Sequence, residues 1–127
     1  MDQKRILVVE DNEDSSEVIS ILVAVLDYDV VAVATRDDAV RMLEQSNIDL
    51  VLMDFQMPGK SLAEFLEDAK RLSPQTMLIL YSAVNCGRIA RKHGIKHWLN
   101  KPFEVEELKK LLEQVFAAVV LGLTVCN

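Results

Sequence analysis

Residues 5–15 read RILVVEDNEDS, and here an unbroken apolar run passes directly into a cluster of acidic residues. A short continuous apolar run is typical of a strand that is buried on both faces of a parallel sheet. Three more such runs follow at fairly even intervals, and a weaker fifth candidate lies near the end of the chain. The five predicted strands are 6–9, 30–34, 50–53, 77–80 and 96–99.

The segments between these runs have apolar residues at the spacing of amphipathic helices. Thr35 and Asp38 also have the spacing of a capping box at the start of one of them. The predicted helices are 18–26, 36–46, 62–72, 86–93 and 105–116, of which the fourth is shortened. Strict alternation of strands and helices predicts an α/β fold, a flavodoxin-like doubly wound sheet of five parallel strands in the order 2-1-3-4-5.

Length and composition limit the class of protein. A chain of 127 residues predicts a single domain over 1–127, and half of its residues are hydrophobic, as in ordinary globular proteins. The formal net charge of -6 argues against direct binding to nucleic acid, which depends on clustered Lys and Arg. Cys86 and Cys126 lack the spacing of a disulfide framework or a zinc site. With no apparent export signal, the chain is expected to be cytoplasmic.

Acidic residues stand at the ends of two predicted strands. Glu10 and Asp11 follow the first strand, and Asp54 follows the third. In the predicted sheet order these strands are neighbours, and ligands bind beyond their carboxyl ends. Like charges this close repel one another unless a cation neutralises them, and Mg²⁺ prefers such oxygen ligands. The sequence therefore predicts a magnesium site, whereas residues 12–14 are expected only to start a helix.

Two further residues are expected at the same edge of the sheet. Ser82 follows the fourth strand and Lys101 follows the fifth. A hydroxyl and an ammonium group there could each contact a phosphoryl oxygen. The chemistry that these residues permit is nucleophilic attack by Asp54 on phosphorus, giving an aspartyl phosphate.

The chain resembles the receiver domain of two-component response regulators over nearly its whole length. The resemblance rests on four motifs in this order: VVEDN at 8–12, LMDFQMPG at 52–59, YSA at 81–83 and KPF at 101–103. It implies a phosphoprotein that acts in signal transduction through a phosphorelay. It also implies that the chain is not an enzyme beyond self-phosphorylation and autodephosphorylation.

The resemblance assigns a role to each matching residue. It implies that Asp54 is the phosphoacceptor, that Glu10 and Asp11 serve Mg²⁺, and that Lys101 and Ser82 contact the phosphoryl group. The backbone carbonyl of Gln56 would be a further metal ligand, Ser82 and Trp98 would report activation, and Gln56 and Val84 would tune autodephosphorylation. The Lys101–Pro102 bond is a candidate for the cis form that the family usually has.

The implied partners are a sensor histidine kinase or phosphotransfer protein and a downstream protein target. Three alternatives stay open at this point: a receiver that docks without phosphorylation, an aspartate-nucleophile phosphatase and a carrier of flavin mononucleotide. The phosphatase would need a second Asp where Gln56 stands, and the flavin carrier would need a phosphate loop without the acids after the first strand.

Some features depart from the family pattern. Fewer residues than usual separate Ser82 from Lys101, which shortens the fourth helix. Trp98 is larger than the aromatic residue that the family usually has at this position. A role in packing is therefore an alternative to a role in switching. From about Val115 the last helix extends as an apolar tail, and 115–126 is too short to span a membrane, which takes about 20 residues. A homodimer contact, another partner or a non-native extension would each account for this tail.

Overall fold

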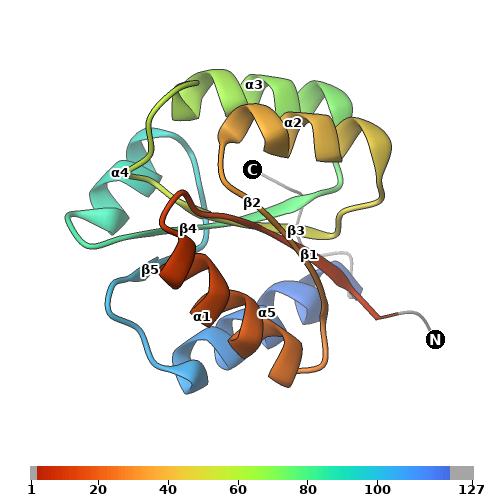
Figure 1. Cartoon of the computed structure of the whole chain (residues 1–127), viewed down its shortest axis with the longest axis vertical. Coiled ribbons are helices and arrows are strands. Elements are labelled where there is room, and N and C mark those ends of the chain that lie inside the picture. Colours follow the sequence, from red (N-terminus) through yellow and green to blue (C-terminus); the bar gives the residue numbers. More distant parts are fainter. Residues whose placement is uncertain (1–2, 121–127) are drawn as a thin grey trace.

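The computed structural model describes residues 3–120, and its five parallel strands form one sheet in the order β2-β1-β3-β4-β5 (Figure 1). The strands are β1 (Arg5–Val9), β2 (Asp29–Val33), β3 (Leu50–Asp54), β4 (Met77–Ser82) and β5 (Trp98–Asn100). The helices are α1 (Glu13–Val25), α2 (Arg36–Gln45), α3 (Leu62–Leu72), α4 (Cys86–Lys92) and α5 (Val105–Val120). The predicted fold, sheet order and shortened fourth helix are confirmed.

The sheet separates two hydrophobic layers. Helices α2, α3 and α4 cover one face of the sheet, and α1 and α5 cover the other (Figure 1). Because side chains alternate along a strand, Leu7 and Val9 enter the first layer while Ile6 and Val8 enter the second. The central strands β1, β3 and β4 bury both faces, which explains why their sequences are continuously apolar.

Several predicted strand boundaries were wrong by one or two residues. Strands β3 and β4 continue to the polar residues Asp54 and Ser82, which pair with residues of neighbouring strands. Strand β2 spans Asp29–Val33 in place of 30–34, and β5 begins at Trp98. The apolar pattern could not show these ends, because backbone pairing holds a polar residue in a strand as well as an apolar one.

The apolar spacing of residues 18–26 predicted a buried stripe on α1 made of Val18, Ile21, Leu22, Val25 and Leu26, of which only Leu22 and Leu26 pack against the core. Val18, Ile21 and Val25 are 57%, 54% and 73% exposed, whereas Ile19 and Val23 are buried. The helix begins at Glu13, which confirms that residues 12–14 start it, and the side chain of Asn12 caps it by accepting a hydrogen bond from the Ser15 N–H. Most sides of α1 are apolar, so spacing alone did not identify the side that faces the sheet.

The other helix predictions agree with the structure. Thr35 caps α2 by accepting a hydrogen bond from the Asp38 N–H, and Ser61 and Glu64 form a capping box at α3. Helix α5 buries Leu108, Leu112 and Val115. The predicted apolar tail continues beyond Val120 into residues 121–127, which lie outside the described part of the chain, as does Cys126. Within residues 3–120, no helix has the length and apolar character needed to cross a bilayer.

Candidate functional site

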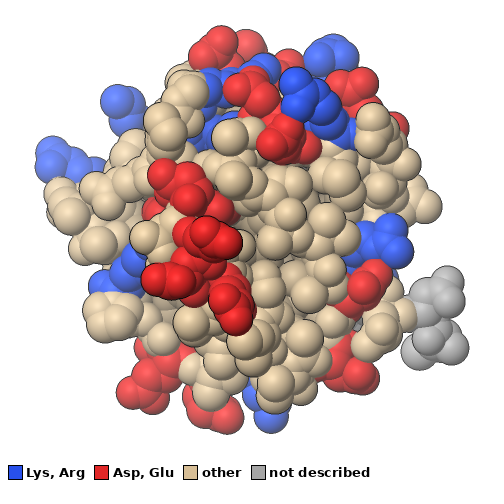
Figure 2. Space-filling model, in the orientation of Figure 1, with Lys and Arg blue, Asp and Glu red and all other residues tan. Residues whose placement is uncertain are grey.

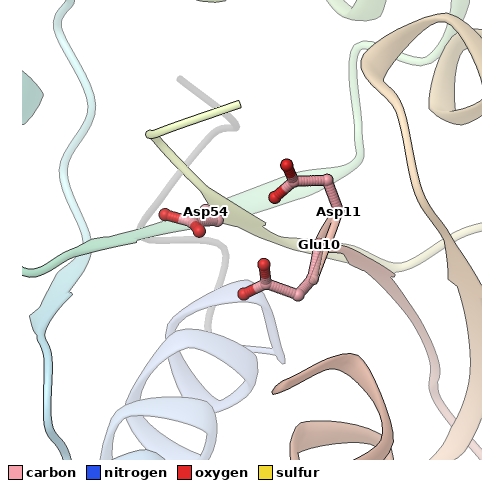
Figure 3. Close-up of side chains that lie close together, drawn as sticks. All are labelled: Glu10, Asp11 and Asp54. Atoms are coloured by element: carbon pink, nitrogen blue, oxygen red, sulfur yellow. The ribbon is translucent and has the colours of Figure 1, made fainter. Parts of the chain in front are cut away.

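Three carboxylates meet at the carboxyl ends of β1 and β3. Glu10 and Asp11 leave the end of β1, and Asp54 is the last residue of β3. One oxygen from each lies within 4.8 Å of the other two, and Figure 3 shows the three side chains around one space. Glu10 and Asp54 are almost fully buried, whereas Asp11 is exposed. The predicted convergence of these acids is confirmed.

The carboxylate of Asp54 is held on both of its oxygens. Oδ1 accepts a hydrogen bond of 3.1 Å from the Gln56 N–H, and Oδ2 accepts one of 3.1 Å from Lys101 Nζ. Lys101 reaches this point because its own N–H binds the carbonyl of Ser82 next to β5. The Lys101–Pro102 bond is cis, as predicted. The structure therefore brings Lys101 to the acids from a distant part of the chain.

Glu10 is also bound through both oxygens. Its Oε2 accepts a hydrogen bond of 3.1 Å from the Asn12 N–H, and its Oε1 accepts one of 2.8 Å from the Tyr81 hydroxyl. Lys101 Nζ lies 3.5 Å from the same Oε1. Burial raises the pKa of Tyr81 far above its usual range, and the negative charge of Glu10 acts in the same direction. The hydroxyl thus keeps its proton and remains a donor at neutral pH.

The donor set fits a hard divalent cation. Three carboxylates face a single ammonium group, so the ionised cluster has excess negative charge in a partly desolvated place. Mg²⁺ takes oxygen ligands and commonly uses one or two carboxylates together with water and a phosphate oxygen. Figure 2 shows more acidic side chains gathered on this face over the start of α1, where Glu13 and Asp14 lie. Their field would also attract a cation.

Ser82 is the last residue of β4, and Gln56 and Val84 lie on the loops that follow β3 and β4. The Ser82 hydroxyl is buried and lies 3.2 Å from the backbone nitrogen and oxygen of Val84. It has no hydrogen bond to Asp54 in the structure. Gln56 and Val84 are both exposed and line one surface depression next to α4. Both side chains are therefore accessible to solvent at the ends of β3 and β4.

Trp98 is placed on the opposite face of the sheet from the acids. Its half-buried ring packs in the layer under α2, α3 and α4, and the Arg91 guanidinium lies over it at 5.8 Å from the centroid. Gly87 of α4 leaves the necessary space, because a Cβ there would come within 3.1 Å of the indole nitrogen. The structure therefore shows Trp98 packed against α4, and a rearrangement of α4 would alter its surroundings.

One buried residue beside the site was missed by the sequence reasoning. The Arg36 side chain is almost fully buried, and it donates hydrogen bonds to the carbonyls of Asp54, Phe55 and Lys60. Burial lowers the pKa of Arg36, and the charge of Asp54 opposes this shift. Arg36 thus fastens the loop after β3 to the start of α2. A signal was available, because a cation in the first turn of a helix opposes the helix dipole and needs another reason to be there.

We expect Arg36→Ala to destabilise the protein by roughly 3 kcal/mol, because three carbonyls would lose a charged donor and a cavity would remain. Urea unfolding followed by circular dichroism measures this change. Arg41→Ala is the matched control on the same helix, since Arg41 forms only an exposed ion pair with Asp38 and its loss should cost far less. Equal destabilisation by the two substitutions would contradict the anchoring role of Arg36.

Comparison with known proteins places the chain in a family. The family model described as "Response regulator receiver domain" matches residues 6–113. The chain is 26% identical to hybrid signal transduction histidine kinase K of Dictyostelium discoideum, and the match covers 86% of this chain and 10% of that kinase. It is 28% identical to the phosphate regulon transcriptional regulatory protein PhoB of Escherichia coli over 91% of its length, which covers 53% of PhoB. The chain therefore spans about half or less of these two relatives.

A solved structure shows the same architecture. The receiver domain of a sensor histidine kinase from Pseudomonas aeruginosa PAO1 is 28% identical, with a TM-score of 0.79, and the match covers 89% of this chain and 97% of that one. That structure is described as having a magnesium ion coordinated in the active site cleft. The acidic cluster Glu10, Asp11 and Asp54 fits the magnesium site of receivers. The chain therefore belongs to the response regulator receiver domains, which are signalling domains of two-component systems.

Proposed function

We propose that this chain is a phosphoacceptor domain that receives a phosphoryl group on Asp54 in a phosphorelay. The observation that carries the proposal is the meeting of three carboxylates within 4.8 Å, with Lys101 Nζ 3.1 Å from Asp54. Glu10, Asp11, Asp54 and the backbone carbonyl of Gln56 would hold Mg²⁺. When bound, the ion would neutralise charge on the transferring phosphoryl oxygens.

The residues of the chain would carry the transfer step. One oxygen of Asp54 attacks the phosphorus and forms a new P–O bond, while the bond from phosphorus to the donor's histidine nitrogen breaks. The nitrogen keeps the electron pair and takes up a proton from solvent. Lys101 stabilises negative charge on a phosphoryl oxygen, and the hydroxyl of Ser82 turns to donate to another. A carboxylate nucleophile needs no general base, because it has no proton that must be removed before it attacks.

The added group would then shift an equilibrium between two surface states. Ser82 must leave its present contacts with Val84 to reach the phosphoryl group, and this change passes into the loop that leads to α4. Trp98 packs on α4 and is the second element of the proposed switch. Gln56 and Val84 would set how readily water reaches the acyl phosphate, since both are exposed beside Asp54.

The proposed donor is a sensor histidine kinase or phosphotransfer protein, and the proposed receiver of the signal is a downstream protein target in the cytoplasm. Protein partners suit the acidic surface better than nucleic acid does. The apolar continuation of α5 is proposed as a further contact, with a second copy of the chain or another partner. Sedimentation of the full chain and of a chain cut after Val120, which keeps the buried Val115, tests this contact, and identical monomeric behaviour would contradict a homodimer.

Phosphorylation is tested by incubating the protein with acetyl phosphate and Mg²⁺ and then measuring its intact mass. We expect a gain of one phosphoryl group that disappears when EDTA removes the metal. A folded protein that binds Mg²⁺ and gains no mass with any small donor or phosphorylated histidine protein would contradict the proposal. That result would favour the alternative of a docking module that works without phosphorylation.

A further inference from the structure

The side chain of Tyr81 crosses the end of one strand to reach the acidic site. Tyr81 lies on β4 and pairs with Asp54 of β3, and β3 separates β4 from β1. Tyr81 and Ile79 belong to the layer under α1 and α5, as do Ile6 and Val8 of β1. Glu10 is two residues beyond Val8 and so emerges on the same side. Alternation along three strands therefore places Tyr81, Asp54 and Glu10 on one face.

The Tyr81 hydroxyl donates a hydrogen bond to the buried carboxylate of Glu10. The distance from the hydroxyl to Glu10 Oε1 is 2.8 Å, and Tyr81 and Glu10 are 0% and 2% exposed. The Glu10 side chain has several rotatable bonds, so its carboxylate must be held in one orientation to bind a cation in a single geometry. The hydroxyl fixes one oxygen, and the Asn12 N–H fixes the other at 3.1 Å. Of these two donors, only Tyr81 is a side chain.

The ring of Tyr81 has separate contacts that a phenylalanine would keep. Lys101 Nζ lies 4.9 Å from the ring centroid, at cation–π distance. The ring of Phe103 meets it nearly edge-on at 5.9 Å between centroids. Packing of the ring and support of Lys101 thus depend on the aromatic face, while the contact with Glu10 depends on the hydroxyl alone. The two contributions can be separated by removing one oxygen atom.

We propose that Tyr81 is a positioning residue of the cation site, whose hydroxyl holds the Glu10 carboxylate in the orientation that binds Mg²⁺. This inference rests on the proposed function, because it takes Glu10 as part of a metal centre. Partners that orient ligating carboxylates commonly affect metal affinity by about 10-fold to 100-fold. The residue acts through Glu10 and does not touch the reacting atoms.

The central test is Mg²⁺ titration of Tyr81→Phe by calorimetry. We expect roughly tenfold weaker binding than in the unchanged protein. Tyr28→Phe is the matched control, because Tyr28 is the other of the two tyrosines and packs against Phe116 of α5, away from the acids. Unchanged Mg²⁺ affinity in folded Tyr81→Phe would overturn the proposal. A lower melting temperature without a change in affinity would show a purely structural role and would overturn it too.

Dependence on Glu10 is tested by a double-mutant cycle. Tyr81→Phe should weaken Mg²⁺ binding in the unchanged protein and have little further effect in Glu10→Gln, because the carboxylate that it orients is gone. Equal effects of Tyr81→Phe in both backgrounds would show that it does not act through Glu10. Calorimetry on the unchanged protein separates the two proposals, since no Mg²⁺ binding there contradicts the proposed function itself.

A measurement with Tyr81 intact covers the case in which Tyr81→Phe does not fold. The Tyr28→Phe protein, produced with 3-fluorotyrosine, has one fluorine-labelled residue, at position 81. We expect its ¹⁹F resonance to shift as Mg²⁺ saturates the site, because the hydrogen-bonded carboxylate then also binds the ion. A resonance that stays in place while calorimetry records saturation would overturn the positioning role.

Discussion

Asp54→Asn is expected to abolish phosphoryl uptake from acetyl phosphate in the presence of Mg²⁺. The amide is a poor nucleophile, and no other carboxylate of the cluster is held between the Gln56 N–H and Lys101 as Asp54 is. Intact-mass measurement over time gives the extent of uptake. Because the amide has nearly the same shape as the carboxylate and removes one of three clustered negative charges, the variant should fold at least as stably as the unchanged protein.

Asp49→Asn is the matched control at the opposite end of the same strand. Asp49 precedes β3, and its carboxylate accepts a hydrogen bond of 2.7 Å from the Arg5 N–H, which an asparagine oxygen can also accept. We expect this variant to take up the phosphoryl group as the unchanged protein does. Continued uptake in Asp54→Asn would contradict Asp54 as acceptor, and digestion of the labelled protein would show whether exposed Asp11 takes its place.

The sheet could be predicted from the sequence because its central strands are buried on both faces. Burial of that kind requires a continuous apolar run, and the runs at 6–9, 50–53 and 77–80 have no other ready explanation. Strand β5 gave a weaker signal, since it spans only Trp98–Asn100 and its last residue is exposed. The stripe of α1 could not be assigned, because apolar residues lie both on its buried side and on its exposed side.

The acids of the site could also be predicted, since a strand end fixes where a residue emerges. Glu10, Asp11 and Asp54 each follow an apolar run, so the order of the strands was enough to bring them together. Arg36 and Tyr81 could not be found from the order of the strands, although a cation in the first turn of a helix is itself an unusual feature of Arg36. The role of each side chain depends on a contact with a residue far away in the chain. Arg36 contacts the loop after β3, and Tyr81 contacts Glu10. Neither spacing nor composition specifies such contacts.

The contrast between Lys101 and Tyr81 leads to a second large expected effect. Both side chains contact Glu10 Oε1, but only Lys101 also contacts Asp54. An ammonium group opposes binding of a metal cation and stabilises a transferring phosphoryl group, whereas a neutral hydroxyl mainly orients its acceptor. Removing each one should therefore alter different steps.

Lys101→Ala is expected to slow phosphorylation of Asp54 by about a hundredfold to a thousandfold, the range seen when one preorganised donor to a transition state is removed. Mg²⁺ affinity should stay the same or increase, because the cation nearest to Asp54 and Glu10 is gone. Rates of mass gain at saturating Mg²⁺ measure the first effect, and calorimetry measures the second.

Lys96→Ala, at an exposed lysine just before β5, is the matched control and should change neither the rate nor the Mg²⁺ affinity. Weaker Mg²⁺ binding that fully accounts for a slower rate in Lys101→Ala would contradict a role in transfer, because Lys101 would then serve only to arrange the acids.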